Sequence, residues 1–229
     1  MNIFKTLYDG VLDILFPPKC VFCGRLLDRE LDMCRQCRLE LEEFPPLPPN
    51  RHPDRKSRLQ FLDSFTAVWY YKGKVRDSIL GLKFHYRVDY AAPLGRSIAM
   101  KLLRENLTDF DLVTWAPVSA RRRLRRGYDQ SRLLAQTIGR ELNLPVVRLL
   151  KKQRNTPAQS TLTTEQRRAN VLGAYRFAGK RPVVGKRILL IDDVFTTGAT
   201  AEECARILLT AGAESVSCAS VAAAQKHTD

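Results

Sequence analysis

The chain has 229 residues, 45% of them hydrophobic and 27% charged, with six cysteines and a net charge of +14. This composition is typical of a folded protein with one full domain and a smaller one. It excludes a disordered chain, a collagen-like chain and a small disulfide scaffold. No stretch reaches the roughly 18 unbroken apolar residues of a membrane span.

The apolar segment 3–16 comes first in the chain. It carries three charged residues and no small-residue cleavage site. This pattern indicates an amphipathic helix rather than a signal peptide. We therefore expect a cytoplasmic protein.

Four cysteines follow within 18 residues, at the spacing Cys-x2-Cys-x10-Cys-x2-Cys. Two such pairs suit a tetrahedral zinc ion held by four thiolates, a closed site that stabilises a fold or docks a partner. A redox dithiol and two disulfides are the alternatives, and the doubled pair without a secretion signal disfavours both. We predict a structural Zn²⁺ on Cys20, Cys23, Cys34 and Cys37.

A proline-rich stretch, 44–53, holds five of the chain's twelve prolines. Such a run is stiff and cannot enter a helix, so it separates modules. A polyproline ligand for a partner is the alternative. We predict a cysteine module over residues 1–45, a linker over 46–59 and a larger domain over 60–225.

Strand and helix patterns alternate along the larger domain. The predicted strands are 65–71, 112–115, 145–150, 188–191 and 215–221. The predicted helices are 75–84, 90–107, 130–142 and 199–211, with a polar loop over 155–164. This alternation predicts a parallel α/β sheet flanked by helices.

All of the excess charge lies between residues 115 and 187, which carry a net +15. A solvated face is one explanation, but a concentrated basic field more often binds phosphates, nucleotides or nucleic acid. A turn at a strand end precedes five arginines here, and arginine side chains match phosphate oxygens in pairs. We predict a pyrophosphate site and, beside it, a nucleic-acid surface. The first comprises Pro117, Val118, Arg121 and Arg126, and the second Arg122, Arg123, Arg125 and Tyr128.

The polar segment from 154 to 170 combines threonines, glutamines and arginines. Its composition suits a mobile lid over a binding site, and a plain connector is the alternative. The predicted mobile loop includes Arg154, Thr156, Gln159, Arg167 and Asn170.

The most informative stretch, 188–200, has four apolar residues, two aspartates, two apolar residues and a Thr/Gly-rich turn before a helix. Ligands of parallel α/β sheets bind at the carboxyl ends of strands. Backbone N–H groups at a helix N-terminus can hold a monophosphate there. Asp192 and Asp193 suit sugar hydroxyls and, directly or through water, Mg²⁺. The predicted phosphate cradle is Thr196, Thr197, Gly198, Ala199 and Thr200.

This stretch resembles the signature with which type I phosphoribosyltransferases bind phosphoribosyl pyrophosphate (PRPP). The resemblance implies a five-stranded parallel core, a 5′-phosphate on residues 196–200 and ribose hydroxyls on Asp192 and Asp193. In hypoxanthine–guanine enzymes an aspartate that serves the purine base stands where this chain has Thr196. A threonine cannot do that work, so a purine-salvage activity is disfavoured.

Together with the cysteine pairs, three stretches resemble the ComF family of competence and DNA-utilisation proteins: Arg-Gly-Tyr-Asp-Gln at 126–130, the pattern of 154–170, and the stretch 71–84. Two positions depart from the family pattern. Asp129 stands where asparagine is usual, and Ser119 where a second proline is usual. The resemblance covers residues 12–225. It implies cytoplasmic handling of incoming single-stranded DNA in natural transformation, with a helicase-like partner.

The sequence leaves three functions open. The first is a nucleic-acid-handling protein built on a PRPP-binding fold, favoured by the basic segment and Tyr128 because single strands bind positive grooves with stacking aromatics. The second is a phosphoribosyltransferase that uses an unidentified acceptor, favoured by the phosphate loop. The third is a regulator that senses PRPP and signals to a partner through the zinc module.

Overall fold

The structure is a computed structural model that describes residues 17–28, 31–47, 51, 59–154, 170–180 and 183–224. The chain divides into two compact units, Met1–Glu42 and Glu43–Asp229. Within the described ranges, no helix is long and apolar enough to cross a membrane. The predicted N-terminal helix and most of the predicted linker lie outside the described residues.

The described residues of the smaller unit form turns, one bridge and one short helix. Lys19 and Leu26 form an antiparallel bridge, which folds the chain back after the first cysteine pair. Helix α2 (Arg35–Glu40) begins at the second pair, where the Cys34 side chain accepts a hydrogen bond from the Cys37 backbone N–H. The four cysteines therefore lie on tight local structures, as their spacing predicts.

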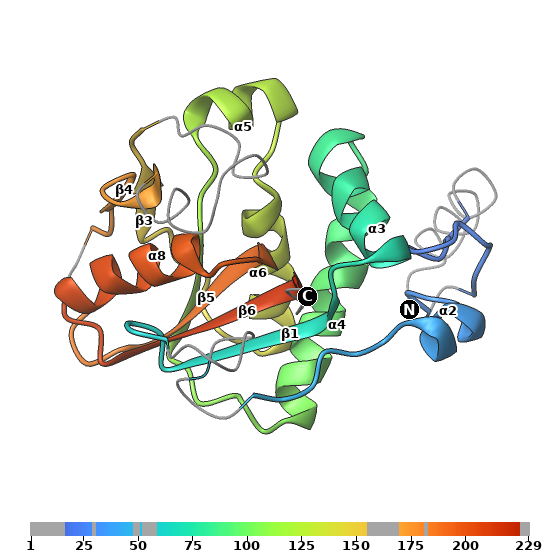
Figure 1. The fold of residues 1–229 in the computed structure, drawn as a ribbon, viewed down its shortest axis with the longest axis horizontal. Helices are drawn as coiled ribbons and strands as arrows, with labels where there is room; N and C mark the ends of the chain where they lie inside the picture. Colours follow the sequence, from blue (N-terminus) through green and yellow to red (C-terminus); the bar gives the residue numbers. More distant parts are fainter. Residues whose placement is uncertain are drawn as a thin grey trace, which may run out of the picture. The chain divides into compact units, whose positions relative to one another are not determined.

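The larger unit is organised around a parallel sheet in the order β1-β6-β5-β2 (Figure 1). Its strands are β1 (Ser64–Tyr70), β2 (Leu112–Trp115), β5 (Arg187–Phe195) and β6 (Ser215–Ala223). The central strand β5 is covered on both faces, and its residues 188–191 are fully buried. A parallel bridge between Val113 and Val146 adds a short fifth position beyond β2. The prediction of a parallel α/β sheet flanked by helices is confirmed.

Helices cover both faces of this sheet. Helices α4 (Ala91–Arg104) and α6 (Gln130–Glu141) pack against each other and against the sheet, and α8 (Ala199–Thr210) contacts β5 and β6. The connection through α8 leads from β5 to β6, that is, toward β1. The connections through α4 and α6 lead in the opposite direction across the sheet, toward β2 and the position beyond it. Because such crossovers are right-handed, α8 lies on the opposite face (Figure 1). Among the described residues, the larger unit also contains the helices α3 (Gly73–Phe84) and α5 (Ala120–Arg126) and a 3-10 turn, η1 (Val88–Tyr90).

The predicted strand 145–150 is divided between two sheets. Residues 145–147 pair with Val113 through two backbone hydrogen bonds of 2.9 Å. The chain then leaves the sheet at Leu149, whose N–H donates to the Thr114 hydroxyl at 3.4 Å. It continues as β3 (Leu150–Lys152), which pairs antiparallel with β4 (Tyr175–Phe177) in a separate two-stranded sheet. At the point where the parallel pairing ends, a side-chain hydrogen bond thus replaces a backbone one, and the sequence pattern does not encode this change.

Strand β5 is longer than the predicted strand 188–191. It pairs with β6 as far as Phe195, so both aspartates lie within the strand. Successive side chains of a strand point to opposite faces. Asp192 and Asp193 are therefore placed in different surroundings.

Candidate functional site

The predicted site residues of β5 and α8 lie at the carboxyl edge of the sheet. Helices α6 and α8, which begin at this edge, lie on opposite faces beside β5. A crevice forms where neighbouring connections leave a parallel sheet in opposite directions, and ligands of this class of fold bind there.

The turn between β5 and α8 has the form of an anion cradle. Gly198 lies in the left-handed region at φ 72° and directly precedes α8. This left-handed residue turns the chain from β5 into α8, and a helix N-terminus is a favourable position for an anion. The Thr197 hydroxyl, which is buried, accepts a hydrogen bond from the Ala199 N–H at 3.5 Å.

A carboxylate in the first turn of α8, Glu202, does not compete for this cradle. Its oxygens accept hydrogen bonds from three successive backbone N–H groups at 2.9–3.3 Å, those of Gln60, Phe61 and Leu62. The negative charge is therefore turned toward the start of β1. The N-terminus of α8 keeps its preference for an added anion.

Asp193 is held by charged and polar side chains from two helices. Only 5% of the residue is exposed, and Lys83 of α3 forms an ion pair with its Oδ1 at 2.8 Å. Gln130, the first residue of α6, donates to its Oδ2 at 2.6 Å. Arg126 in turn donates to the side-chain oxygen of Gln130. Both Asp193 oxygens thus have partners within the protein.

Asp192 lies half-buried on the other side of the strand. Its Oδ1 accepts a hydrogen bond from the Asp193 N–H at 2.9 Å and from the Ser131 hydroxyl at 3.4 Å. Burial and the neighbouring Asp193 carboxylate raise the pKa of Asp192 to about 7. Its ionised form is therefore poorly compensated, and a cation or a hydroxyl donor from a ligand would stabilise it.

Lys152 on β3 is a component that the sequence analysis missed. The side chain is buried, and its Nζ donates to the Tyr175 hydroxyl at 3.2 Å. Burial, with a contribution from Arg122, lowers the pKa of Lys152 to about 8. Tyr175 also shares a hydrogen bond with Thr200 of the cradle. A buried ammonium group thus lies one side chain away from the anion cradle.

The turn before α5 is fastened by Asp129. The Asp129 carboxylate accepts hydrogen bonds from the Val118 N–H at 3.1 Å and from the Arg132 N–H at 3.3 Å, and so caps α6. Burial raises the pKa of Asp129 despite these bonds. The turn formed by Pro117 and Val118 is therefore fixed beside the start of α6.

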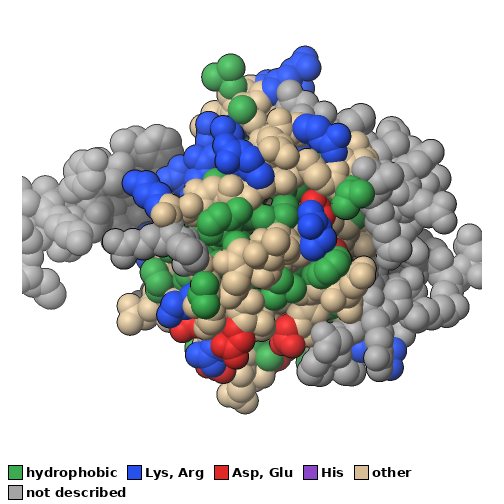
Figure 2. Space-filling model, turned by 90° about the vertical axis from the view of Figure 1, so that its left-hand side faces the viewer, with side chains coloured by type: hydrophobic (Ala, Val, Ile, Leu, Met, Phe, Trp, Pro, Cys, Tyr) green, Lys and Arg blue, Asp and Glu red, His purple; other side chains and the backbone are tan. Residues whose placement is uncertain are grey.

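The five arginines of α5 divide into two groups. Arg121, Arg123 and Arg125 are exposed, and no residue of α5 is buried. Arg122 and Arg126 are half-buried, and burial lowers the pKa of Arg126. Gln130 connects Arg126 to the Asp193 carboxylate. Figure 2 shows basic side chains gathered over the upper part of the molecule, the end at which Figure 1 places α5.

Tyr128 and the predicted mobile loop are the remaining members of the predicted site. The Tyr128 hydroxyl donates to the Leu82 carbonyl, so it fastens α3 to the α5–α6 turn. The predicted mobile loop lies largely outside the described residues, including Thr156, Gln159 and Arg167. At its ends, Arg154 donates to the Leu172 carbonyl, and Asn170 Nδ2 is buried without a partner among the described residues. The roles of these residues stay predictions.

In the smaller unit, the four predicted zinc ligands come together. Their Sγ atoms all lie within 4.8 Å of one another. The Cys23 and Cys34 sulfurs are 3.6 Å apart, close to the roughly 3.8 Å expected between thiolates on one tetrahedral zinc ion with Zn–S bonds of about 2.3 Å. The Cys37 N–H donates to Cys34 Sγ, and this bond lowers the pKa of Cys34 to about 7. The set fits a structural zinc site.

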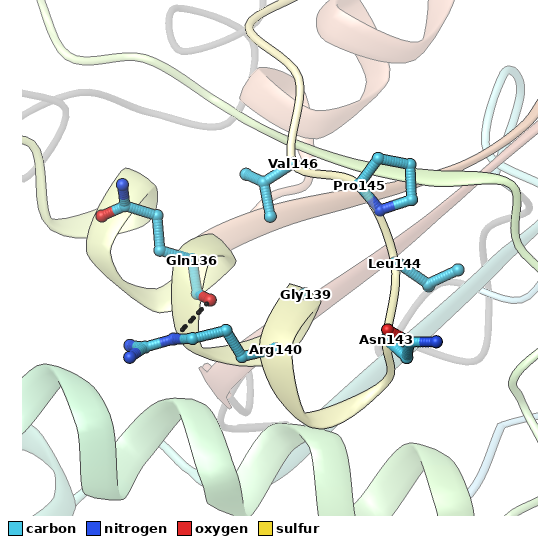
Figure 3. A pocket seen from close by; sticks show the side chains of 7 residues that line it. All are labelled: Gln136, Gly139, Arg140, Asn143, Leu144, Pro145 and Val146. Carbon is cyan, nitrogen blue, oxygen red and sulfur yellow. Dashed lines mark hydrogen bonds between the residues drawn. The ribbon is translucent and has the colours of Figure 1, made fainter.

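A surface hollow lies at the other end of α6 (Figure 3). Gly139 lets the helix approach the fifth strand position there, because a Cβ would lie 2.2 Å from Val146 Cγ2. The Arg140 side chain donates to the Gln136 carbonyl at 3.2 Å. The hollow contains none of the predicted site residues and no carboxylate, so it is not the candidate site. Its lining residues are Gln136, Gly139, Arg140, Asn143, Leu144, Pro145 and Val146.

In comparisons with known proteins, two different family models match the two parts of the chain. A family model described as a phosphoribosyl transferase domain matches residues 128–229, and one described as a double zinc ribbon domain matches residues 11–48. The chain is 31% identical over 202 residues to the DNA utilization protein YhgH of Escherichia coli (strain K12), covering 86% of each. It is 36% identical over 97 residues to competence protein F of Haemophilus influenzae, covering 42% of each. A solved purine phosphoribosyltransferase from Pyrococcus horikoshii Ot3 is 17% identical with a TM-score of 0.37, over 61% of this chain and 75% of that one.

Proposed function

Because the chain belongs to the ComF/YhgH family, we propose that it binds PRPP with Mg²⁺ at the β5–α8 turn and handles single-stranded DNA along α5. The matched relatives are named as DNA utilization and competence proteins. A cytoplasmic setting is part of the proposal, since a four-thiol metal site requires reduced cysteines.

The observation that carries the PRPP proposal is the meeting of a helix N-terminus with two unlike carboxylates at one sheet edge. The 5′-phosphate would accept hydrogen bonds from the backbone of residues 196–200, with the dipole of α8 in its favour. Asp192 would accept a ribose hydroxyl. Arg126 and Lys83 already lie beside Asp193, where they, with Arg121 and the Pro117–Val118 turn, would offset the charge of the pyrophosphate.

The carboxylates also fit a magnesium ion. Mg²⁺ is usually held through one or two carboxylates together with substrate phosphates and water. We assign Asp192 as its ligand, because both oxygens of Asp193 are bonded to Lys83 and Gln130. When bound, Mg²⁺ would neutralise part of the pyrophosphate charge.

The DNA part of the proposal rests on α5. A small anion cannot engage arginines on all sides of one helix, whereas an extended phosphate backbone can use several of them. Such contacts bind without reading sequence. The zinc ribbon, which has no open metal position, is the surface we assign to a helicase-like protein partner.

Calorimetry with PRPP and Mg²⁺ tests the first part. Wild-type protein should release heat on binding, and Asp192→Asn should bind at least tenfold more weakly. Glu141→Gln, an exposed change at the far end of α6, is the matched control and should bind like wild type. Absence of heat with wild-type protein would refute the PRPP proposal. Filter binding of a single-stranded oligonucleotide at low salt tests the second part in the same way.

Transfer of the phosphoribosyl group is the second candidate function. The observation in its favour is the half-buried Arg126 beside the Asp193 network, where a cation would stabilise departing pyrophosphate. Pyrophosphate release from PRPP, measured with and without single-stranded DNA, decides between binding alone and transfer. Release that Arg126→Gln abolishes would support transfer.

A further inference from the structure

The end of α3 exposes two aromatic side chains. Phe84 is 53% exposed and Tyr86 is 69% exposed. Aromatic rings contribute most to stability when they are buried, so two exposed rings two residues apart mark a contact surface. Phe84 and Tyr86 are called here the aromatic corner.

Tyr86 is displayed by a backbone conformation that tyrosine rarely adopts. Its φ is 56°, in the left-handed region that favours glycine. The conformation is held by the Arg87 N–H, which donates to the Gly81 carbonyl at 3.3 Å, and by the Val88 N–H, which donates to the Tyr86 carbonyl at 2.8 Å. A glycine here would end the helix at a lower backbone cost. The ring itself is therefore the feature that needs an explanation.

A cation and a phenol lie beside the aromatic corner. The Arg126 guanidinium lies 5.2 Å from the centre of the Phe84 ring. The Tyr128 hydroxyl, which is bonded to Leu82 of α3, lies close enough to Tyr86 for the two phenols to interact electrostatically. Arg126 is also the last residue of α5, so the aromatic corner lies beside the C-terminal end of this arginine-rich helix. Aromatic rings beside a basic groove are the usual surface for single-stranded nucleic acid.

The aromatic corner is also connected to the candidate ribose site. Phe84 follows Lys83, and Lys83 pairs with Asp193. Asp193 is bonded to Gln130, and Gln130 to Arg126, which stacks on Phe84. These five side chains form a closed ring between the aromatic corner and β5. A base on the corner would therefore lie beside the PRPP site.

We propose that the aromatic corner stacks the bases of single-stranded DNA while the arginines of α5 hold its phosphates. This inference rests on the proposed DNA-handling function and names the residues that contact the bases. Stacking accepts any base, so the preference among sequences should be slight. The corner adds a dependence on bases that phosphate contacts alone do not give.

The experiment compares a thymidine oligomer with an abasic oligomer of equal length, which has the same phosphates and no bases. Wild-type protein should bind the thymidine oligomer about 5- to 150-fold more tightly for each stacked base. Tyr86→Gly should reduce this ratio without harming the fold, since glycine favours the backbone conformation at that position. Phe84→Leu should also reduce it, whereas Tyr86→Phe should keep it. Met100→Ala removes another exposed apolar side chain, on α4, and should leave the ratio unchanged.

The possible results separate the two proposals. Equal wild-type affinity for both oligomers, or a ratio unchanged in both Tyr86→Gly and Phe84→Leu, overturns the stacking role and leaves phosphate binding intact. Absence of binding to either oligomer at low salt overturns the DNA-handling function itself. The PRPP calorimetry is independent of both results.

Discussion

The two adjacent aspartates of β5 should respond in opposite ways to the same substitution. Asp193→Asn removes the charge that neutralises Lys83, whose side chain is 20% exposed, whereas that of Asp193 is 8% exposed. Removing one partner of a buried ion pair typically costs about 3–5 kcal/mol. Because Lys83 retains some contact with water, we expect Asp193→Asn to lower the free energy of unfolding by about 2–3 kcal/mol.

Asp192→Asn should not lower the free energy of unfolding. Burial and repulsion from Asp193 raise the pKa of Asp192 to about 7, so the folded chain tolerates its ionised form poorly. An asparagine of the same shape removes that charge. At pH 8 the free energy of unfolding should therefore equal or exceed that of wild type, while PRPP affinity falls. Stability and ligand binding are thus assigned to different aspartates.

Urea unfolding at pH 8 measures the first quantity, and calorimetry with PRPP and Mg²⁺ the second. A double-mutant cycle with Lys83→Met and Asp193→Asn isolates the ion pair from the hydrogen bond to Gln130. A coupling energy below about 0.5 kcal/mol would refute the argument, since that is the scatter of non-interacting sites. Equal loss of stability in the two asparagine variants would refute it as well.

Three further predictions concern the metal, a buried lysine and the arginines. Elemental analysis should find about one zinc per chain, and Cys34→Ser should lose both the metal and the fold of the smaller unit; a folded, metal-free wild type contradicts this. Burial lowers the pKa of Lys152 from 10.5 to about 8. The folded chain then binds fewer protons than the unfolded chain between these values, so the free energy of unfolding should rise with pH across that window. Urea unfolding of Lys152→Met should lack this rise, and an equal rise in the variant contradicts the assignment. For single-stranded DNA, log affinity should fall with log salt by about 0.7 per phosphate neutralised. Arg122→Ala with Arg125→Ala should flatten the slope by about one to two units, and an unchanged slope assigns these arginines elsewhere.

Most elements of the parallel sheet and its flanking helices were predictable because their patterns are local, whereas α5 and the antiparallel pair β3–β4 were not predicted. The apolar run at 188–191 predicted the central strand, and the cysteine spacing predicted a four-thiolate cluster, which the structure brings together. The helix patterns at 130–142 and 199–211 match α6 and α8 to within one residue at each end. Each of these signals lies within a short window of sequence, where period and spacing are sufficient.

The partners of the site were not predictable in the same way. Lys83 and Gln130 meet Asp193 across 110 and 63 positions of sequence, and their contact depends on the crossover geometry of three elements. Lys151 and Lys152 are neighbours in a three-residue strand, in which the Lys152 side chain is buried and the Lys151 side chain is exposed. Nothing in a pair of adjacent lysines tells which of them faces the core. The packing of β4 and α8 around β3 decides it.

One signal for the unlike aspartates was nevertheless present in the sequence. Val194 and Phe195 follow the acids and are apolar, which is the pattern of a strand that continues rather than of a turn. Extending the strand to Phe195 places Asp192 and Asp193 within it, and the two-residue period of a strand then points them to opposite faces. The local sequence pattern could thus have shown that the two carboxylates have different surroundings and different roles. Only the fold could show that Asp193 is neutralised from α3 and α6, which leaves Asp192 as the more open carboxylate.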